Sequence, residues 1–237
     1  MKSFRGPAPL HHTLLANRTR TGVTLQTLHN KHFDRGLIVK QTEFDIPNPE
    51  SCTVPELLDV VSARGAQMLV DGIRSADVLF NVHHPPLLLD PTNSNVDDLI
   101  YARKISSEDR HVDWAAWSWP EIRKRCRILG PLWSMATTCL NNNNRSSSFS
   151  QKRVIFTSMD KVEFHQQHDY EELPPGQPFI VERNSTTKEL YVFAQDGTLI
   201  HIHQMKVEGE QAAVGSTAAL KARMVDHGSL HFHKPLE

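Results

Sequence analysis

The sequence predicts a mixed α/β protein in two parts. Helix-like and strand-like patterns alternate in the first third, whereas short apolar runs separated by Gly, Pro and Asn turns dominate the region after residue 150. A Pro-, Asn- and Asp-rich stretch lies between them, at about residues 85–108, and such a change in composition is typical of a domain boundary. We therefore place one domain at residues 1–85, a linker at 86–117 and a second domain at 118–228.

The elements of the first domain can be assigned in order. Residues 7–17 open with prolines and continue with leucines, which predicts a short helix. Residues 24–29 and 37–46 carry β-branched and apolar residues on either side of the polar loop HNKHFDRG, and we expect two strands there. Thr53 and Glu56 form a capping-box pattern ahead of apolar residues at helical spacing, so a long helix is expected through about residue 74.

Two strands and two helices are too few to build a parallel sheet covered on both faces. We therefore expect part of the apolar stripe of the long helix to be uncovered, and the first domain to be more loosely packed than the second.

The second domain begins with another capping-box pattern, Ser118 with Glu121, and a helix that places apolar and basic residues on opposite faces. Residues 141–151 (NNNNRSSSFSQ) form a polar tract that we expect to be a disordered insertion. Strands are expected at residues 153–156, 179–182, 190–194 and 198–203, followed by a helix at 216–224. This series is typical of a small β-barrel or a sandwich.

Composition limits the function classes. The chain has 237 residues, a net charge of −1 and three cysteines without metal-ligand spacing, which favours a reducing compartment. No apolar run is long enough for a membrane helix, and no targeting signal is legible. Since the net charge is close to zero, any contact with nucleic acid has to be local.

Two stretches then carry a family resemblance. Residues 5–39 (RGPAPLHHTLLANRTRTGVTLQTLHNKHFDRGLIV) and 101–114 (YARKISSEDRHVDW) resemble methionyl-tRNA formyltransferases, and PGQPFIVE at 175–182 and DGTLIHIHQMK at 196–206 fit the same family more loosely. The resemblance implies the end of a doubly wound α/β catalytic domain, a linker, and a C-terminal barrel of OB-like topology. The fold class expected is thus α/β, with an incomplete doubly wound formyltransferase domain followed by a small OB-like barrel.

The resemblance also implies a reaction, the transfer of a formyl group from 10-formyltetrahydrofolate to the amino group of methionyl-initiator tRNA, without a metal. In this family an Asn stabilises the oxyanion, a His handles protons and an Asp orients the His. Asp34 stands at the position of that Asp. Asn81 and His83 repeat the Asn-x-His spacing downstream of Asp34, in the wrong order. We therefore expect a chain that lacks the N-terminal part of the catalytic domain and is impaired in catalysis.

Basic residues are the candidates for binding tRNA phosphates. By the resemblance, Arg5 lies in a loop that approaches the acceptor end of the tRNA, and the others flank the linker: Arg103, Lys104, Arg123, Lys124 and Arg127. A solvated surface is the alternative for each of them. We expect a monomer located in the mitochondrial matrix, with no membrane contact.

Two other functions remain open, a non-catalytic tRNA-binding fragment and another folate-dependent formyltransferase. The YARKI linker argues against the second. The His201/His203 pair lacks a third ligand for zinc. Trp114, Trp117 and Trp119 are expected to pack at the junction of linker and barrel rather than to stack on bases.

Overall fold

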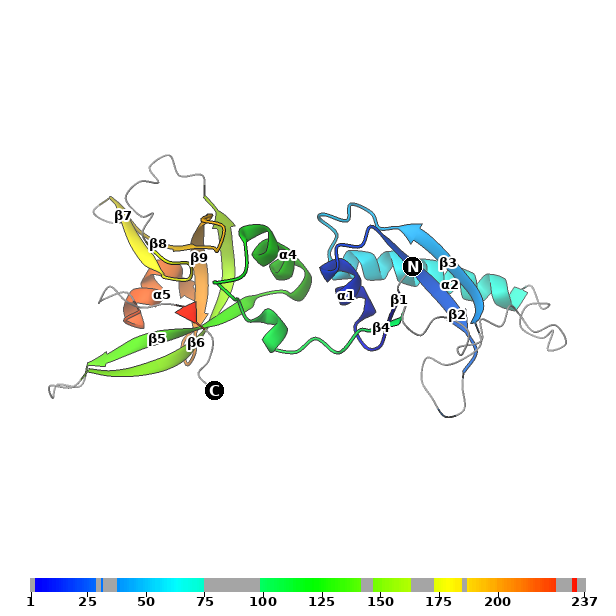
Figure 1. Ribbon diagram of the computed structural model, residues 1–237, viewed down its shortest axis with the longest axis horizontal. Helices are drawn as coiled ribbons and strands as arrows, with labels where there is room; N and C mark the ends of the chain where they lie inside the picture. The colour runs from blue at the N-terminus through cyan, green and yellow to red at the C-terminus, as the bar shows by residue number, and fades with distance from the viewer. Residues whose placement is uncertain are drawn as a thin grey trace. The chain divides into compact units, whose positions relative to one another are not determined.

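In the computed structural model, the chain divides into two compact units, Met1–Ile105 (unit 1) and Ser106–Glu237 (unit 2) (Figure 1). Each unit is described by itself. The structure describes residues 3–28, 31, 38–74, 99–141, 147–162, 173–184, 187–224 and 232–233. The boundary after Ile105 lies inside the stretch expected as a linker, so the described linker residues 99–105 belong to unit 1 and those from 106 to unit 2.

Unit 1 contains the predicted short helix, α1 (Pro9–Leu15), and the predicted pair of strands, β2 (Arg20–Gln26) and β3 (Ile38–Asp45). The strands pair antiparallel, from Arg20 opposite Asp45 to Gln26 opposite Ile38. β2 begins four residues before the predicted start, and its added residues include the β-branched Thr21 and Val23. At its first residue the Arg20 guanidinium lies 3.1 Å from the Asp45 carboxylate, which forms a cross-strand ion pair at the end of the hairpin.

The long helix α2 (Val54–Arg74) has the predicted bounds, and its capping box is formed. The Glu56 carboxylate accepts hydrogen bonds from the Thr53 backbone N–H at 2.8 Å and from the Thr53 hydroxyl at 2.9 Å. The Glu56 backbone N–H is 3.4 Å from the Thr53 hydroxyl oxygen. These bonds satisfy amide groups that the first turn of a helix otherwise leaves unpaired.

One face of α2 packs on β2. Leu57 and Met68 are buried on this face. Gly72 allows close approach, since a Cβ there would lie 3.3 Å from a Leu25 methyl group. The opposite face carries large apolar side chains that are between 40% and 57% exposed, namely Leu58, Leu69, Val70 and Ile73. The expectation of a partly uncovered apolar stripe is confirmed.

A second, parallel two-stranded sheet in unit 1 joins β1 (Ser3–Arg5) to β4 (Leu99–Tyr101). The Ala102 N–H donates to the Arg5 carbonyl at 2.6 Å, and the Ala8 N–H donates to the Ala102 carbonyl at 3.2 Å. Between these bonds Gly6 adopts a φ of +124°, which a side chain would strain. The pairing was not predicted, because a two-stranded parallel sheet leaves no local signal in the sequence.

Unit 2 is built on an antiparallel sheet with the order β11-β5-β6-β9-β8-β7, and β10 pairs with β9. Its helices are η2 (Glu108–Arg110), α4 (Trp119–Leu129) and α5 (Gly215–Lys221). The strands are β5 (Leu132–Asn141), β6 (Ser147–Lys161), β7 (Phe179–Asn184), β8 (Thr187–Phe193), β9 (Leu199–Val207), β10 (Ala213–Val214) and β11 (Phe232–His233). Within the described ranges no ladder joins β7 back to β5 or β11, so the sheet is an open path.

The four predicted strands correspond to β6–β9, and the last predicted helix corresponds to α5. The expected insertion at 141–151 differs from the structure, because β5 extends to Asn141 and β6 begins at Ser147. Ladder hydrogen bonds use backbone groups alone, so a polar sequence can continue a hairpin that apolar residues start elsewhere. Residues 142–146 lie outside the described residues.

The core of unit 2 lies between the sheet and the helices. On β9, Ile200, Ile202, Met205 and Val207 are all fully buried, although strict alternation would bring only one pair to the core. The β6–β9 register shifts on either side of Ser158, which pairs with Gln204. At this irregularity the alternation of inward and outward side chains along β9 shifts by one residue. Even-numbered residues face the core before it and odd-numbered residues after it, so both ends of the strand bury apolar residues.

We predict that two substitutions in α2 differ strongly in their effect on the free energy of unfolding of unit 1. Leu57→Ala empties a fully buried position and should destabilise unit 1 by about 2–4 kcal/mol, whereas Ile73→Ala, at 57% exposure, should cost less than about 1 kcal/mol. Far-UV circular dichroism during urea unfolding reports the loss of this long helix. All four tryptophans lie in unit 2, so their fluorescence is the internal control and should keep its midpoint in both variants. Equal shifts for the two variants would contradict the packing described.

Candidate nucleic-acid interface

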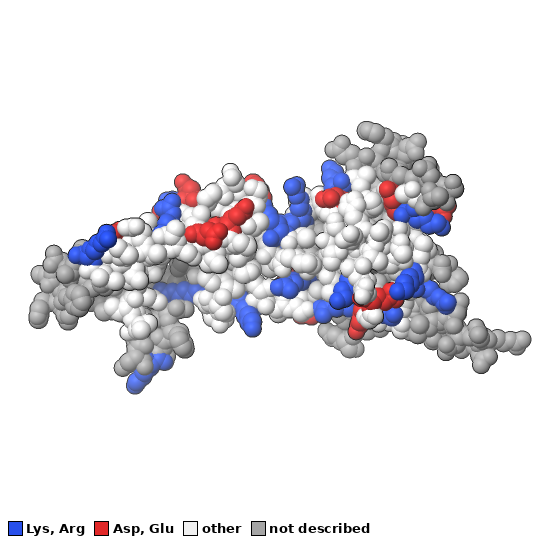
Figure 2. All heavy atoms as spheres, turned by 180° about the vertical axis from the view of Figure 1, so that it is seen from behind, with Lys and Arg blue, Asp and Glu red and all other residues white. Residues whose placement is uncertain are grey.

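The six basic residues expected to bind tRNA divide between the units. Arg5, Arg103 and Lys104 belong to unit 1, whereas Arg123, Lys124 and Arg127 lie on α4 in unit 2. On the face drawn in Figure 2, the Lys and Arg side chains are interspersed with Asp and Glu. No broad basic surface covers that face, so the candidates have to be judged one group at a time.

The group in unit 1 is assembled by the β1–β4 pairing. Arg5 stands opposite Tyr101 in the ladder, and Arg103 and Lys104 follow directly after it. The His12 ring nitrogen contacts the Arg103 carbonyl at 3.0 Å, which fixes the backbone between the strand and the two exposed cations. The Arg103 guanidinium donates to the Lys104 carbonyl at 3.2 Å. Three positive charges from distant parts of the sequence thus lie along one short segment.

The group in unit 2 depends on how α4 begins. A capping box was expected, but Ser118 makes no side-chain capping bond, and that part of the prediction is wrong. The Asp196 carboxylate, in the turn after β8, accepts the Trp119 N–H instead, at 3.2 Å. A negative group at this end also suits the helix dipole. The cap of this helix is therefore supplied by a residue distant in the sequence, and not by the local capping-box pattern.

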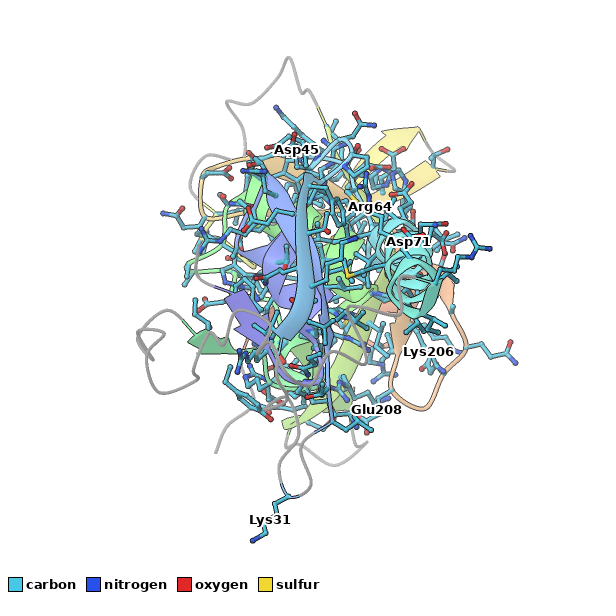
Figure 3. All side chains as sticks on the ribbon, turned by 90° about the vertical axis from the view of Figure 1, so that its right-hand side faces the viewer. Lys31, Asp45, Arg64, Asp71, Lys206 and Glu208 are labelled. Carbon is cyan, nitrogen blue, oxygen red and sulfur yellow. The ribbon has the colours of Figure 1, made fainter. Side chains whose placement is uncertain are left out.

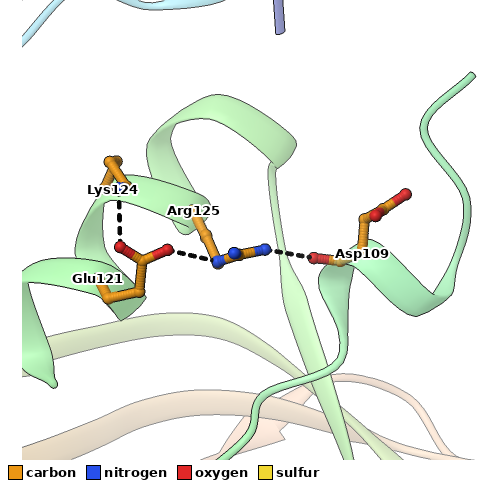
Figure 4. A network of polar contacts seen from close by, with 4 residues as sticks. All are labelled: Asp109, Glu121, Lys124 and Arg125. Atoms are coloured by element: carbon orange, nitrogen blue, oxygen red, sulfur yellow. Dashed lines mark hydrogen bonds and ion pairs between the residues drawn. The ribbon is translucent and has the colours of Figure 1, made fainter. Parts of the chain in front are cut away.

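Glu121 is free for another role, shown in Figure 4. Its two carboxylate oxygens each lie 2.7 Å from a cation, the Lys124 ammonium and the Arg125 Nε. Arg125 also lies 4.2 Å from the centre of the Trp117 ring and 3.5 Å from the Asp109 carbonyl. Burial raises the pKa of Glu121, but the hydrogen bonds from Lys124 and Arg125 outweigh it, so the pKa is lowered overall.

These contacts separate the basic residues of α4 by role. The Lys124 side chain is only 17% exposed and already pairs with Glu121, whereas Arg123 is exposed. Arg127 is half-buried, and its Nε is buried without a hydrogen-bond partner in the described part of the chain. Arg125 was missed by sequence reasoning, although its spacing of four residues from Glu121 is the signal of an ion pair within a helix.

The end of the linker stretch 101–114 has a structural role, because its last residues pack in the core of unit 2. Val112 and Trp114 are 1% and 3% exposed, and the Trp114 ring meets Phe156 edge to face at 5.7 Å. The Asp113 carboxylate accepts the N–H groups of Ala115 and Ala116 at 3.1 and 3.2 Å, which forms a tight turn between the motif and α4. The expectation that the tryptophans pack rather than stack on bases is confirmed for Trp114, which is buried in the core, and Trp117 and Trp119 pack against it.

Trp133 anchors the linker to the sheet. The Arg153 guanidinium lies 3.8 Å from the centre of its ring, and the His111 ring meets it edge to face at 4.6 Å. Its Nε1 donates to the Ser107 carbonyl at 2.8 Å, and its carbonyl accepts the Val112 N–H at 2.9 Å. Both ends of the segment from 107 to 112 are therefore held by a single residue of β5.

Other polar residues of the sheet point to solvent or bind the backbone. The side chains of Lys206 and Glu208 project from the end of β9 and the turn after it (Figure 3). The Glu208 carboxylate accepts the Arg153 N–H at 3.0 Å. The His201 and His203 rings lie 4.0 Å apart, and His203 is 3.4 Å from Asp160. In the ranges that the structure describes, no three His, Cys, Asp or Glu side chains are arranged to hold a metal ion.

Asp34, the candidate catalytic residue, lies outside the described residues, as do Asn81 and His83. Its role therefore stays a prediction. Within the described helices, none is long and apolar enough to cross a membrane.

Comparison with known proteins identifies relatives. No protein-family model matches the chain. The human mitochondrial methionyl-tRNA formyltransferase is 34% identical over 139 residues, which are 59% of this chain and 33% of that protein. The methionyl-tRNA formyltransferase of Bacillus velezensis is 30% identical over 215 residues, which are 91% of this chain and 58% of that protein.

The chain is a homologue of the methionyl-tRNA formyltransferases. The mitochondrial methionyl-tRNA formyltransferase of Saccharomyces cerevisiae is also similar, at 31% identity over 64% of this chain and 40% of that protein. The chain thus spans between about a third and 58% of the length of these formyltransferases.

A solved structure supports the mixed helix and sheet fold. A variant of HypX from Aquifex aeolicus aligns with 95% of this chain and 36% of that protein, with a TM-score of 0.51 and 15% sequence identity. At this identity the similarity concerns the fold alone. The relation to methionyl-tRNA formyltransferases therefore rests on sequence.

We predict that Glu121 stabilises unit 2 in a pH-dependent way. Because its pKa is lowered in the folded state, its contribution is present above its unfolded pKa of about 4.3 and is lost as the pH falls through the folded value. Glu121→Gln should cost about 1–2 kcal/mol at neutral pH and progressively less below about pH 4. Urea unfolding followed by tryptophan fluorescence measures this difference.

The matched control is Glu182→Gln. Glu182 also pairs with a lysine, Lys188, but both side chains are about half exposed, so the change should cost less than about 0.5 kcal/mol at any pH. If Glu121→Gln behaved like this control, the contacts in Figure 4 would be energetically irrelevant.

Proposed function

We propose that the protein acts in translation initiation as a methionyl-tRNA formyltransferase. It would transfer the formyl group of 10-formyltetrahydrofolate to the amino group of methionyl-initiator tRNA. The observation that carries this proposal is 30% identity to a methionyl-tRNA formyltransferase over 91% of the chain. The mitochondrial relatives support a location in the mitochondrial matrix. We also propose that it acts as a monomer.

The domains are assigned by the same proposal. Residues 1–85 form the C-terminal part of a doubly wound catalytic domain, 86–117 the linker and 118–228 an OB-like barrel. The parallel β1–β4 pair joins the first range to residues of the linker, and parallel strands of this kind are typical of doubly wound sheets. The antiparallel sheet with α4 and α5 supports the last.

The residues have distinct roles in this proposal. Asp34 stands at the position from which the Asp of the family orients a catalytic His, and no metal takes part. Arg5, Arg103, Lys104, Arg123 and Arg127 neutralise tRNA phosphates. Lys124 does so less, because its ammonium is engaged by Glu121 at 2.7 Å. The contrast between Lys124 and the exposed Arg123 follows from exposure and pairing, which decide how much a cation gains from a new phosphate partner.

A second candidate function is tRNA binding without turnover by this chain alone. The observation that favours it is the contrast between the units, because the large buried core cluster belongs to unit 2. Another folate-dependent formyltransferase is the third candidate. Among the residues that the structure describes, no contact favours it.

A formylation assay beside a tRNA-binding titration separates these functions. With 10-formyltetrahydrofolate and methionyl-initiator tRNA, we expect this chain to bind the tRNA but to form product far more slowly than a full-length bacterial relative used as the positive control. Formation of product at the rate of the relative would remove the proposed impairment. Formylation of a small amine without any dependence on tRNA would favour the third candidate instead.

We predict that two neighbouring residues of α4 differ in their effect on tRNA binding. Arg123→Gln removes an exposed cation and should weaken binding and lower the slope of log K against log salt by about 0.7–0.9. Lys124→Gln removes a cation that is already paired and should change the slope by much less. Fluorescence anisotropy at several salt concentrations measures both. Equal slopes for all three proteins would argue against contact between α4 and the phosphates.

A further inference from the structure

We propose that Tyr101 is a stacking platform for an unpaired base of RNA, placed among the basic residues of unit 1. The inference rests on the proposed tRNA-binding function and names the part of the RNA that this site contacts. It concerns a residue to which sequence reasoning gave no role of its own.

The first observation is exposure. Tyr101 is 72% exposed. This is unusual, because tyrosine rings are amphipathic and usually have their apolar faces covered. Tyr191 shows the ordinary arrangement within the same chain. It is fully buried, its ring lies 5.9 Å from that of Phe179, and its hydroxyl donates to the Glu189 carboxylate. Tyr101 therefore offers an aromatic surface that does not serve the core.

The second observation is that the backbone under Tyr101 is fixed on both sides. Tyr101 ends β4, opposite Arg5, and the next residue, Ala102, is fully buried and hydrogen-bonded through both its N–H and its carbonyl to the N-terminal segment. A group that projects from such a segment loses little backbone freedom when it binds a ligand.

The third observation is that Gly6 makes room for the ring. A Cβ on Gly6 would lie 3.0 Å from the Cε2 atom of Tyr101 and 2.6 Å from the Ala102 carbonyl oxygen. The edge of the ring thus lies along the Gly6 backbone, where no other residue fits. This contact sets the position of the ring while leaving most of its surface open to solvent.

The fourth observation is charge. Arg5 is the ladder partner of Tyr101, and the exposed Arg103 and Lys104 follow it by two and three positions. An aromatic side chain flanked by cations is the usual arrangement for single-stranded nucleic acid, because bases stack on the ring while the cations contact phosphates. Bases inside a duplex are already stacked on one another, so the ligand is an unpaired stretch, such as the single-stranded 3′ end of a tRNA.

The test compares Tyr101→Ala and Tyr101→Phe in the full chain with three probes, namely intact tRNA, the same tRNA without its unpaired 3′ nucleotides, and a short unstructured oligoribonucleotide. We expect Tyr101→Ala to weaken binding of intact tRNA at least about fivefold, because one stacked base contributes about 1–3 kcal/mol. Tyr101→Phe keeps the ring and should bind like the wild type. On the shortened tRNA, the wild type and Tyr101→Ala should bind equally.

Salt dependence gives a second readout that a general loss of structure would not reproduce. Tyr101→Ala removes no charge and should leave the slope of log K against log salt unchanged, whereas Arg103→Gln should lower it by about 0.7. Circular dichroism and tryptophan fluorescence check that each variant is folded.

The outcomes distinguish this inference from the proposed function. If wild type and Tyr101→Ala bind intact tRNA equally, or if Tyr101→Phe loses as much as Tyr101→Ala, the stacking role is overturned and the proposed function stands. If the wild type binds the oligoribonucleotide in a Tyr101-dependent way but not tRNA, the proposed function is overturned and the stacking role stands. Binding of neither RNA overturns both.

Discussion

The parallel pairing of β1 with β4 is the interaction on which the basic site of unit 1 depends. It joins two segments that are far apart in the sequence. The His12 ring and the Arg103 carbonyl, which are in contact, are separated by 91 positions. Without the two hydrogen bonds of Ala102, Arg5 and Arg103 would have no fixed relation, and Tyr101 would end a free segment. A small amount of backbone pairing therefore gathers charge and aromatic surface that the sequence scatters.

Basic residues serve two different purposes in this protein: some hold the fold together, and others are candidates for binding phosphate. In unit 2, Arg125 and Lys124 neutralise Glu121, and Arg153 covers Trp133, so these cations hold the linker segment and α4 in place. Such cations have little left to offer a ligand. An exposed cation such as Arg123 is the better candidate for phosphate, so exposure narrows the set of basic residues that a sequence pattern selects.

The two capping-box patterns show how far local sequence reaches. Thr53 and Glu56 form the predicted bonds with each other at the start of α2, where Glu56 is exposed. The same pattern at Ser118 and Glu121 marks the start of α4 correctly, but Asp196 takes the N–H and two cations take the carboxylate. A helix start is a local property and was predictable, whereas the partners that satisfy it come from the tertiary structure.

Strand prediction failed where the core uses small polar residues. β5 faces the core with Leu132, Ser134, Ala136 and Thr138, so it lacks the apolar alternation by which β6–β9 were found. The Thr138 hydroxyl is satisfied by Ser150 across the ladder, which makes its burial possible. Of the candidate site, the identity of the basic residues was predictable, but their pairing, exposure and grouping were not.

The shifted register between β6 and β9 has a consequence for how unit 2 tolerates change in length. Because Ile202 and Met205 both face inward only through the irregularity at Ser158 and Gln204, the two ends of β9 are out of phase with each other. Regular pleating of a strand of the present length would turn Met205 and Val207 outward while Lys206 and Glu208 turned in, whereas the loss of one residue at that point would let both ends face the core without an irregularity. β9 can therefore accept a one-residue deletion at this point more readily than in the regular parts on either side of it.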